Sequence, residues 1–270
     1  MSKKLKNHVL SLLGLSFAAF LFIASASSKQ STGTVQSLVE KVHAKFDFSP
    51  PSREKIGSAG ITIAMVKPTY VHKNPEYLVP PFNDMASGMA SDFDELLIAK
   101  GFTIKGPFGS RDEMTFNDKE NSSFILEIDI ELTFAGADSR IYTTIEHAPS
   151  FAESVVNKYA RSTYTYKVYG QIILGGKLVI KAKSARYGEL LWTKSIDLEG
   201  SSFACPGQNE YPGKPEFHTE LNQDALVYNT ISRELEKLYS KALNLAWQQI
   251  DAAEMKTVAA EGKKADKKGN

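Results

Sequence analysis

The sequence predicts a single α+β domain. Its mixed sheet opens with a βαβ unit, continues as an antiparallel meander and is closed by a long C-terminal helix. Two observations predict this class. First, an amphipathic stretch over 82–100 lies between apolar runs at 60–66 and 102–105, which gives the order strand, helix, strand. Second, period-two alternation over 124–134 is followed by strand-like segments over 162–198 with tight turns. A mixed sheet with separate helices accommodates both patterns.

The helix of the opening unit is predicted from its spacing. Its apolar side chains recur at steps of three and four residues, so they lie on one face. Gly101 fits the left-handed position that often follows a helix. Because both connections are short, we expect the flanking strands to form a parallel pair. The apolar positions are Phe82, Met85, Met89, Phe93, Leu96 and Leu97.

The strand at 124–134 alternates between apolar and mostly polar residues, which predicts one buried and one wet face. Its acidic residues, Glu127, Asp129 and Glu131, could bind calcium or a basic partner. However, carboxylates two residues apart on a strand lie roughly 6.8 Å apart, which is too far for one ion without other ligands. We therefore favour cross-strand charge pairing. The lysines on polar strand faces are Lys167, Lys181 and Lys183.

Residues 135–162 have no clear period and are expected to form an irregular loop or a weak helix. Within the meander, Gly175 and Gly176 permit a bend or bulge. A Gly/Pro-rich loop is expected over 200–218, after the last strand.

The closing helix is predicted over 221–258, where apolar residues recur at a and d positions for about three heptads. We expect its first half to pack on the sheet, with Leu238 facing the core. The apolar face thins beyond Trp247, so 248–262 is expected to project and to dock a partner. The last residues, 259–270, are expected to be a charged, disordered tail.

Residues 1–26 have the features of a secretory signal: a basic start, an apolar run and a small-residue cleavage site at Ala26–Ser27. The alternative, an uncleaved anchor, needs roughly 20 apolar residues, and this run is shorter. After the signal we expect an N-terminal extension over 27–58 and the α+β domain over 59–258.

Charge and cysteine content restrict the classes of partner. Three of the 32 Lys and Arg residues lie in the signal, so the mature chain has 29 basic and 31 acidic residues. That balance gives no general attraction to nucleic acid, and we expect no nucleic-acid partner. The single cysteine, Cys205, allows an intermolecular disulfide, but a small buried apolar residue is the favoured interpretation.

No motif in the sequence indicates catalysis, a cofactor or a metal ion. The segment 170–177 is similar to a phosphate-binding loop, but its lysine is one position late and no helix is expected to follow. Cys205 and His218 share one loop, yet no third residue would orient them as a nucleophile and base. The protein is therefore expected not to be an enzyme. A periplasmic hydrolase remains the least favoured alternative.

Tyrosines concentrate in the first strand of the later meander, at Tyr164, Tyr166 and Tyr169. Aromatic faces bind sugars, so a glycan site is one interpretation. Strand propensity and core packing are the other.

Three segments, 95–132, 170–198 and 250–264, resemble the neuraminyllactose-binding hemagglutinin (HpaA-like) family of bacterial envelope proteins. The resemblance implies an outer-membrane or cell-surface protein of a Gram-negative bacterium. Association with a flagellar sheath and binding of sialylated glycans are further implications. The family's lipid-bearing cysteine has no counterpart near the predicted cleavage site, so we expect peripheral membrane association without a lipid anchor. In the region of the family's sialic-acid motif, Arg140 and Tyr142 are candidate contacts.

The sequence thus predicts an exported, non-enzymatic envelope protein that acts by macromolecular binding. It would be a subunit of an outer-membrane, surface or flagellar-sheath assembly, with envelope proteins or further copies of itself as partners. The alternative is a glycan-binding adhesin of the sialic-acid type.

Overall fold

The first strand, helix and further strand form the predicted βαβ unit. In the computed structural model, which describes residues 39–135, 141–157 and 159–268, these elements are β1 (Thr62–Val66), α2 (Phe82–Ala99) and β3 (Thr103–Phe108). β1 and β3 pair in parallel, as expected from their short connections to α2. Gly101 follows the helix with a φ of 84°, a left-handed conformation that suits glycine.

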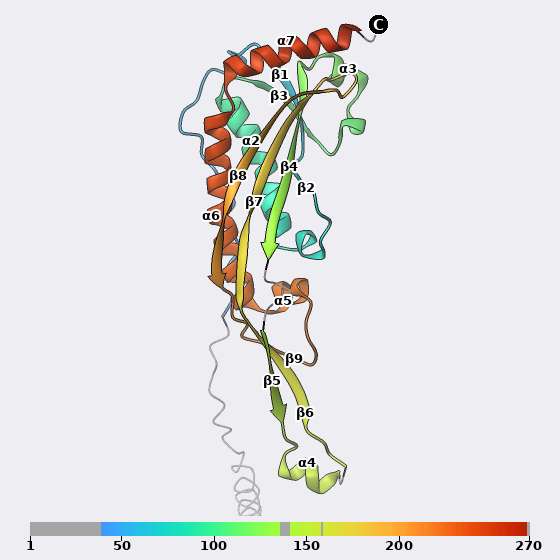
Figure 1. Cartoon of the computed structure of the whole chain (residues 1–270), viewed down its shortest axis with the longest axis vertical. Coiled ribbons are helices and arrows are strands. Elements are labelled where there is room, and N and C mark those ends of the chain that lie inside the picture. The colour runs from blue at the N-terminus through green and yellow to red at the C-terminus, as the bar shows by residue number, and fades with distance from the viewer. Residues whose placement is uncertain (1–38, 136–140, 158, 269–270) are drawn as a thin grey trace, which may run out of the picture. The chain divides into compact units, whose positions relative to one another are not determined.

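Six strands form the main sheet, in the order β3-β1-β4-β7-β8, with β2 (Thr69–Tyr70) also pairing with β4 (Figure 1). β4 (Phe124–Ala135) is parallel to β1, whereas β7 (Gln171–Lys183) is antiparallel to both of its neighbours, β4 and β8 (Leu190–Ala204). The mixed sheet and the meander are both confirmed. The connections contain the short helices η1 (Pro75–Leu78), η2 (Arg111–Glu113) and α3 (Phe116–Glu120).

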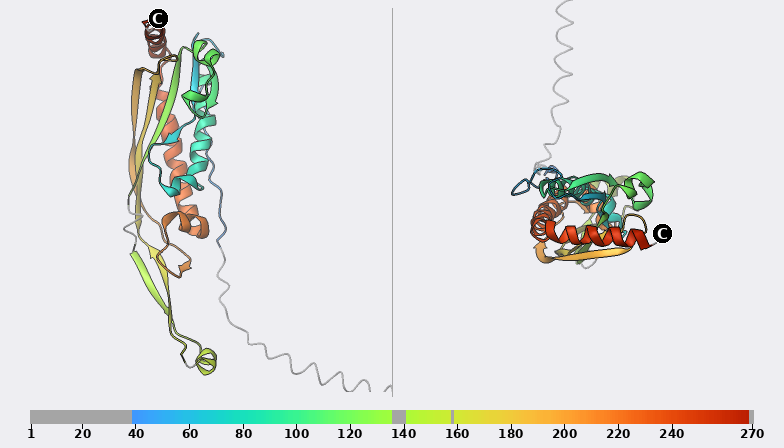
Figure 2. Two further views of the ribbon diagram at one scale, coloured as in Figure 1. Left: turned by 90° about the vertical axis from the view of Figure 1, so that its right-hand side faces the viewer. Right: turned by 90° about the horizontal axis from the view of Figure 1, so that it is seen from above.

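Helices α2 and α6 (Ala225–Gln249) pack side by side on one face of this sheet (Figure 2). Their apolar faces and the inward residues of β1, β4, β7 and β8 form the main core. Leu238 of α6 belongs to this core, as predicted, and is 6% exposed. The opposite face of the sheet carries the charged residues of β4 and β7. Fully buried large side chains include Tyr228, Tyr239, Phe82, Phe93, Phe102 and Phe124.

The C-terminal part differs from the single helix predicted over 221–258. It consists of three helices: α5 (Phe217–Gln223), α6 and α7 (Ala252–Lys268). Asp224 separates α5 from α6, and its carboxylate caps α6. Asp251 separates α6 from α7 and accepts hydrogen bonds from the backbone amides at the start of α7. The chain therefore changes direction twice, because two aspartates offer the backbone an alternative to helix continuation.

Helix α7 corrects the prediction that 248–262 projects as a docking segment. It packs against β4 and β8, with Met255, Val258 and Ala259 buried. The Trp192 indole of β8 donates a 2.8 Å hydrogen bond to Glu254 of α7. The region beyond residue 259, predicted as a disordered tail, is helical as far as Lys268. Charged residues dominate this helix, but its apolar positions are enough to hold it on the sheet edge.

Residues 135–162 were predicted to form an irregular loop or a weak helix; a short helix does form there, but the strands on either side of it were not predicted. β5 (Ile141–His147) and β6 (Thr163–Tyr169) form an antiparallel hairpin, which we call the arm, with α4 (Phe151–Val156) in its connection (Figure 1). The short strand β9 (Glu210–Tyr211) pairs with β6, so the arm is a second, three-stranded sheet.

The expected boundary between an N-terminal extension and the domain, at residue 58, differs from the structural one. From Val39 onward the chain belongs to the same unit as the domain. The ring centroid of Phe46 lies 5.2 Å from that of Tyr239 on α6, and Phe48 is buried in the core. The backbone amide of Val42 donates to the side chain of Asn229 at 2.8 Å.

The predicted signal and its cleavage site at Ala26–Ser27 lie outside the described residues. Within the described ranges, no helix is both long enough and apolar enough to cross a membrane.

Candidate binding surface

The tyrosines predicted as contact residues lie on the arm but do not share one face. Successive side chains of a strand point to opposite sides, so Tyr164 and Tyr166 lie on one face of β6 and Tyr169 on the other. Tyr164 is 52% exposed and Tyr169 is 40% exposed. The backbone of Tyr142 in β5 pairs with Val168 in β6. Arg140 lies outside the described residues.

The acidic stripe of β4 forms cross-strand ion pairs with lysines of β7, as the charge pattern predicted. The Glu131–Lys177 pair follows the strand register directly, and the other two pairs are diagonal. Glu127 and Asp129 each lie 2.5 Å from their lysines, Lys183 and Lys181 respectively, and Glu131 lies 2.9 Å from Lys177. Within the described residues, no group of three or more His, Cys, Asp and Glu side chains could hold a metal ion. This stripe is a charged sheet face.

The other motifs that were considered for chemistry are parts of the fold. Cys205 is fully buried in the main core, as predicted for a small apolar residue. His218 lies on α5, with its Nδ1 atom 3.3 Å from a carboxylate oxygen of Glu216. Gly176 lies in a β-bulge of β7 with a φ of 139°, and a Cβ atom there would lie 2.1 Å from the carbonyl oxygen of Glu131. The glycine pair therefore allows the backbones of β4 and β7 to approach closely at the bulge.

A polar cluster joins the three strands of the arm near the connection that contains α4. His147, at the end of β5, has its Nε2 atom 2.9 Å from the Glu210 carboxylate and 2.8 Å from the Thr165 hydroxyl. The same hydroxyl donates to Glu210 at 2.7 Å. The hydrogen bond from Thr165, together with His147, holds the pKa of Glu210 below its usual value. This cluster connects β5, β6 and β9 where the connection containing α4 begins.

Helix α4 begins with a complete capping box, which explains why so short a helix forms. The hydroxyl of Ser150 accepts from the backbone amide of Glu153 at 3.2 Å. In return, the Glu153 carboxylate accepts from the backbone amide and from the hydroxyl of Ser150, both at 2.8 Å. These two hydrogen bonds lower the pKa of Glu153, and the amide contributes more than the hydroxyl. Two helix-terminal donors are satisfied without any contact to the rest of the protein.

The most unusual feature of the arm is its apolar end. The exposed fractions are 86% for Phe151, 67% for Val155, 88% for Val156 and 83% for Tyr159. We call these four residues the apolar tip. Three of them lie on α4: Phe151 and Val155 are four residues apart and share one side of the helix, whereas Val156 is its last residue and lines the neighbouring cavity. Grouped apolar side chains that remain in water mark a contact surface more often than isolated ones do.

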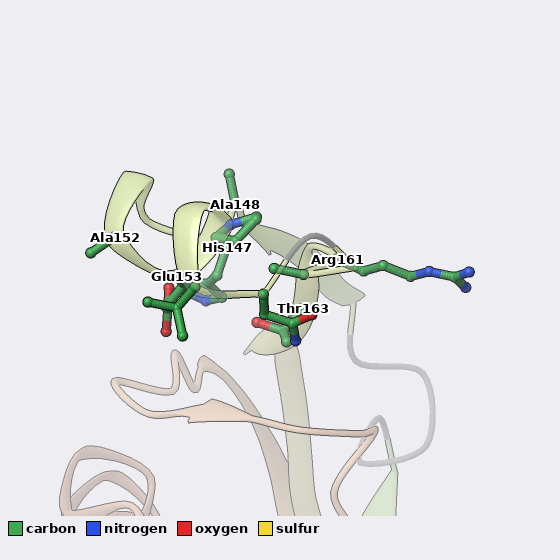
Figure 3. Close-up of a pocket in the computed structure, with 10 residues that line it drawn as sticks. His147, Ala148, Ala152, Glu153, Arg161 and Thr163 are labelled. Carbon is green, nitrogen blue, oxygen red and sulfur yellow. The ribbon is translucent and has the colours of Figure 1, made fainter.

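A cavity of about 600 Å³ lies between α4 and the ends of the two arm strands (Figure 3). The side chains from α4 are mostly small and apolar, whereas those from the strand ends are polar. Arg161 extends away from α4 in this view. Every residue that lines the cavity belongs to the arm: His147, Ala148, Pro149, Ala152, Glu153, Val156, Asn157, Ala160, Arg161 and Thr163.

A second cavity, of about 390 Å³, lies beside η1 on the main domain. Its aromatic wall consists of Tyr70 and Tyr77, which stack with ring centroids 4.4 Å apart. The Tyr70 hydroxyl donates to the carbonyl of Phe82 at 2.7 Å, so this tyrosine is already engaged in the fold.

One feature of the sequence indicates helix α4, although apolar periodicity does not reveal it. Ser150 and Glu153 have capping-box spacing and are followed by two valines. A helix of six residues is too short for its apolar spacing to be distinguished from chance, so only the cap could have indicated it.

No protein-family model and no curated protein matches the sequence. Solved structures do match the fold. A protein from Helicobacter pylori, described as a neuraminyllactose-binding hemagglutinin homolog, is 10% identical, with 80% of this chain and 98% of that one covered and a TM-score of 0.52.

Two further structures are more distant. The PelC dodecamer from Paraburkholderia phytofirmans is 12% identical over 73% of this chain and 91% of that one, with a TM-score of 0.28. Lipoprotein GNA1162 from Neisseria meningitidis is 13% identical over 64% and 99%, with a TM-score of 0.25. At these identities the comparisons concern architecture, and this chain shares its fold with the Helicobacter pylori hemagglutinin homolog.

Proposed function

We propose that this protein is exported to the envelope of a Gram-negative bacterium and acts there by binding another macromolecule. It would serve as a subunit of an outer-membrane, surface or flagellar-sheath assembly. The predicted signal over 1–26 supports export. The fold likeness to a hemagglutinin homolog supports an envelope role by analogy only.

The observation that carries the proposal is the apolar tip. Phe151 and Val156 are more than four-fifths exposed at the end of a hairpin. The free energy falls when a binding partner removes such side chains from water. The arm strands are ordered by their own ladder and by β9, so the tip is presented on a fixed element. Binding that uses a preformed element avoids the entropic cost of ordering a loop.

Site-specific photo-crosslinking in intact cells tests this proposal. A photoreactive phenylalanine analogue at Val155 is expected to crosslink to an envelope component. The matched control places the same analogue at Leu78, which is 77% exposed on η1 of the main domain. Equal crosslinking from both positions, or none from Val155, would contradict a role for the arm.

Glycan binding is a second candidate, which the exposure of Tyr164 favours. An exposed tyrosine ring can stack on a sugar face. Tyr166, Tyr169, Tyr142 and Arg140 remain proposed contacts. A glycan array with the purified protein should show sialylated ligands whose signal falls in Tyr164→Ala. An array without signal would remove this candidate and leave the first.

A further inference from the structure

We propose that the apolar tip inserts into the interfacial region of an anionic phospholipid bilayer, so that the arm holds the protein peripherally on a membrane. The proposal rests on the envelope location in the proposed function, and it assigns the tip to a lipid surface that would hold the protein beside its macromolecular partners. Its support comes from the side-chain types exposed at the end of the arm, from the net charge there and from the capped start of α4.

The side chains at the end of the arm are those that a bilayer interface accepts. Phe151, Val155 and Val156 lie on α4, in the connection at the far end of the hairpin (Figure 1). An aromatic ring and branched aliphatic groups exposed together on a short helix are typical of segments that lie at the boundary between headgroups and acyl chains. An occupant with a flat, fluid surface suits them, because it needs no complementary groove.

Tyrosines lie next to this apolar group. Tyr159 lies three residues after the end of α4 and Tyr164 lies at the start of β6, and both are more than half exposed. A tyrosine ring prefers apolar surroundings while its hydroxyl prefers water, so tyrosine is enriched at the headgroup level of membranes. Apolar groups on α4 with tyrosines beside them are therefore a combination of side chains that an interface accepts.

The charge that remains at the tip is positive. Glu153 is the acidic residue between 147 and 163, and it is outnumbered there by two basic residues. Arg161 is exposed and makes no ion pair with any residue that the structure describes. The sequence supplies one more cation in this segment, Lys158. Basic residues beside an apolar helix favour anionic headgroups.

The backbone of the tip can enter an interface at low cost. Polar backbone groups that leave water without a hydrogen-bond partner are strongly penalised. Here the capping box satisfies two backbone donors at the start of α4, and the strand ladder satisfies backbone groups as far as the pair His147–Thr163. A protein partner fits less well, because a six-residue helix offers far less than the roughly 800 Å² per partner of a stable protein interface.

Vesicle flotation with the processed full-length protein tests the proposal. The vesicles contain phosphatidylethanolamine and phosphatidylglycerol at a 3:1 ratio, with phosphatidylcholine alone as the comparison. The double variant Val155→Ser/Val156→Ser is expected to lower the partition coefficient at least tenfold. Arg161→Gln should lower it about threefold on anionic vesicles only, since one charge is lost. All variants share the same N-terminus, so any contribution from it cancels.

The matched control is Leu78→Ser, which removes an equally exposed apolar side chain from the main domain and should leave partition within twofold. A second readout uses Phe151→Trp, compared with the parent protein, whose Trp192 and Trp247 pack against the main core. The fluorescence that the new tryptophan adds to that of the parent should shift to shorter wavelength on vesicles and should be quenched by brominated lipid. Unchanged thermal unfolding of the variants would show that the fold is intact.

Three results obtained with the variants would overturn the lipid proposal. One is binding that the double variant leaves unaltered. Another is an indole of the Phe151→Trp variant that remains in water on vesicles. The third is self-association without lipid that the double variant abolishes, which would identify a second copy as the occupant. If Val155 crosslinks to an envelope protein in cells while purified protein ignores vesicles, the lipid surface is wrong and the proposed function stands.

Discussion

The Tyr239 hydroxyl of α6 donates a hydrogen bond to the Asp92 carboxylate of α2, and this pair joins the two helices that cover the sheet. Asp92 is 7% exposed. Burial disfavours its charged form and raises its pKa above the usual value, while the hydrogen bond from Tyr239 opposes part of this shift. Burial and the neighbouring Asp92 likewise raise the pKa of Tyr239. The pair is a polar contact inside an otherwise apolar helix interface.

Asp92→Asn is expected to change the pH dependence of stability. Because the pKa of Asp92 is higher in the folded than in the unfolded protein, its protonated form favours folding. That contribution is complete below the unfolded pKa and is lost as the pH rises through the folded pKa. Asparagine accepts the hydrogen bond from Tyr239 without a charge. The stability of the variant relative to the parent should therefore be greater at pH 7 than at pH 3.5. Urea unfolding gives the difference in unfolding free energy between the variant and the parent at each pH. The same difference at pH 3.5 and at pH 7 would contradict the argument.

Asp224→Ala is expected to cost about 3 kcal/mol of unfolding free energy, because buried donors lose their acceptor. One carboxylate oxygen of Asp224 accepts from the backbone amides of Gln208 and Asn209, at 2.6 and 2.8 Å. The other accepts from two amides at the start of α6. Asp251→Ala is the control, since this exposed residue caps α7 alone and should cost about 1 kcal/mol. Equal losses in urea unfolding would argue against Asp224 as a shared anchor.

Gly176→Ala should destabilise the protein by several kcal/mol, because the added Cβ atom would meet the backbone of β4 at 2.1 Å and the residue has a φ of 139°. Gly213→Ala provides the comparison: a Cβ atom there meets nothing within 4 Å. Its melting temperature should stay close to that of the parent. Similar melting temperatures for both variants would show that the bulge can relax.

Met255→Ala should cost about 2–5 kcal/mol, the usual range for a buried methionine, because Met255 is 1% exposed under α7. Lys256→Ala, one residue later on the exposed side, should be nearly neutral. Truncation after Ala246 removes all of α7 and should unfold much of the domain. If the truncated protein kept the parent's melting temperature, the result would support the prediction from the sequence that this segment projects.

The main sheet could be predicted because its two faces differ in solvent exposure. β4 has an apolar face under the helices and a charged face outside, so its residues alternate clearly. The arm offers no such contrast. Thr143, Thr144 and Glu146 in β5 are all exposed, so apolar periodicity could not reveal the strand.

The helix breaks were missed for a different reason. Apolar spacing continues across Asp224 and Ile250, because successive helices pack on the same core. The signals that mark the breaks are local hydrogen-bonding residues, namely aspartates at capping positions. The apolar tip was missed because a hydrophobic residue in a sequence is expected to be buried, and Phe151 is exposed.

Helices α6 and α7 supply one wall of the core and are the last elements in the chain. A nascent chain can complete β4, β7 and β8 but cannot close their inner face until the residues after Ala225 have emerged. Folding of the sheet and addition of the helices are therefore ordered by synthesis itself, and the apolar face stays available to holding chaperones throughout. Under the proposed export, a chain that stays open in this way would suit a translocation channel, which admits unfolded polypeptides.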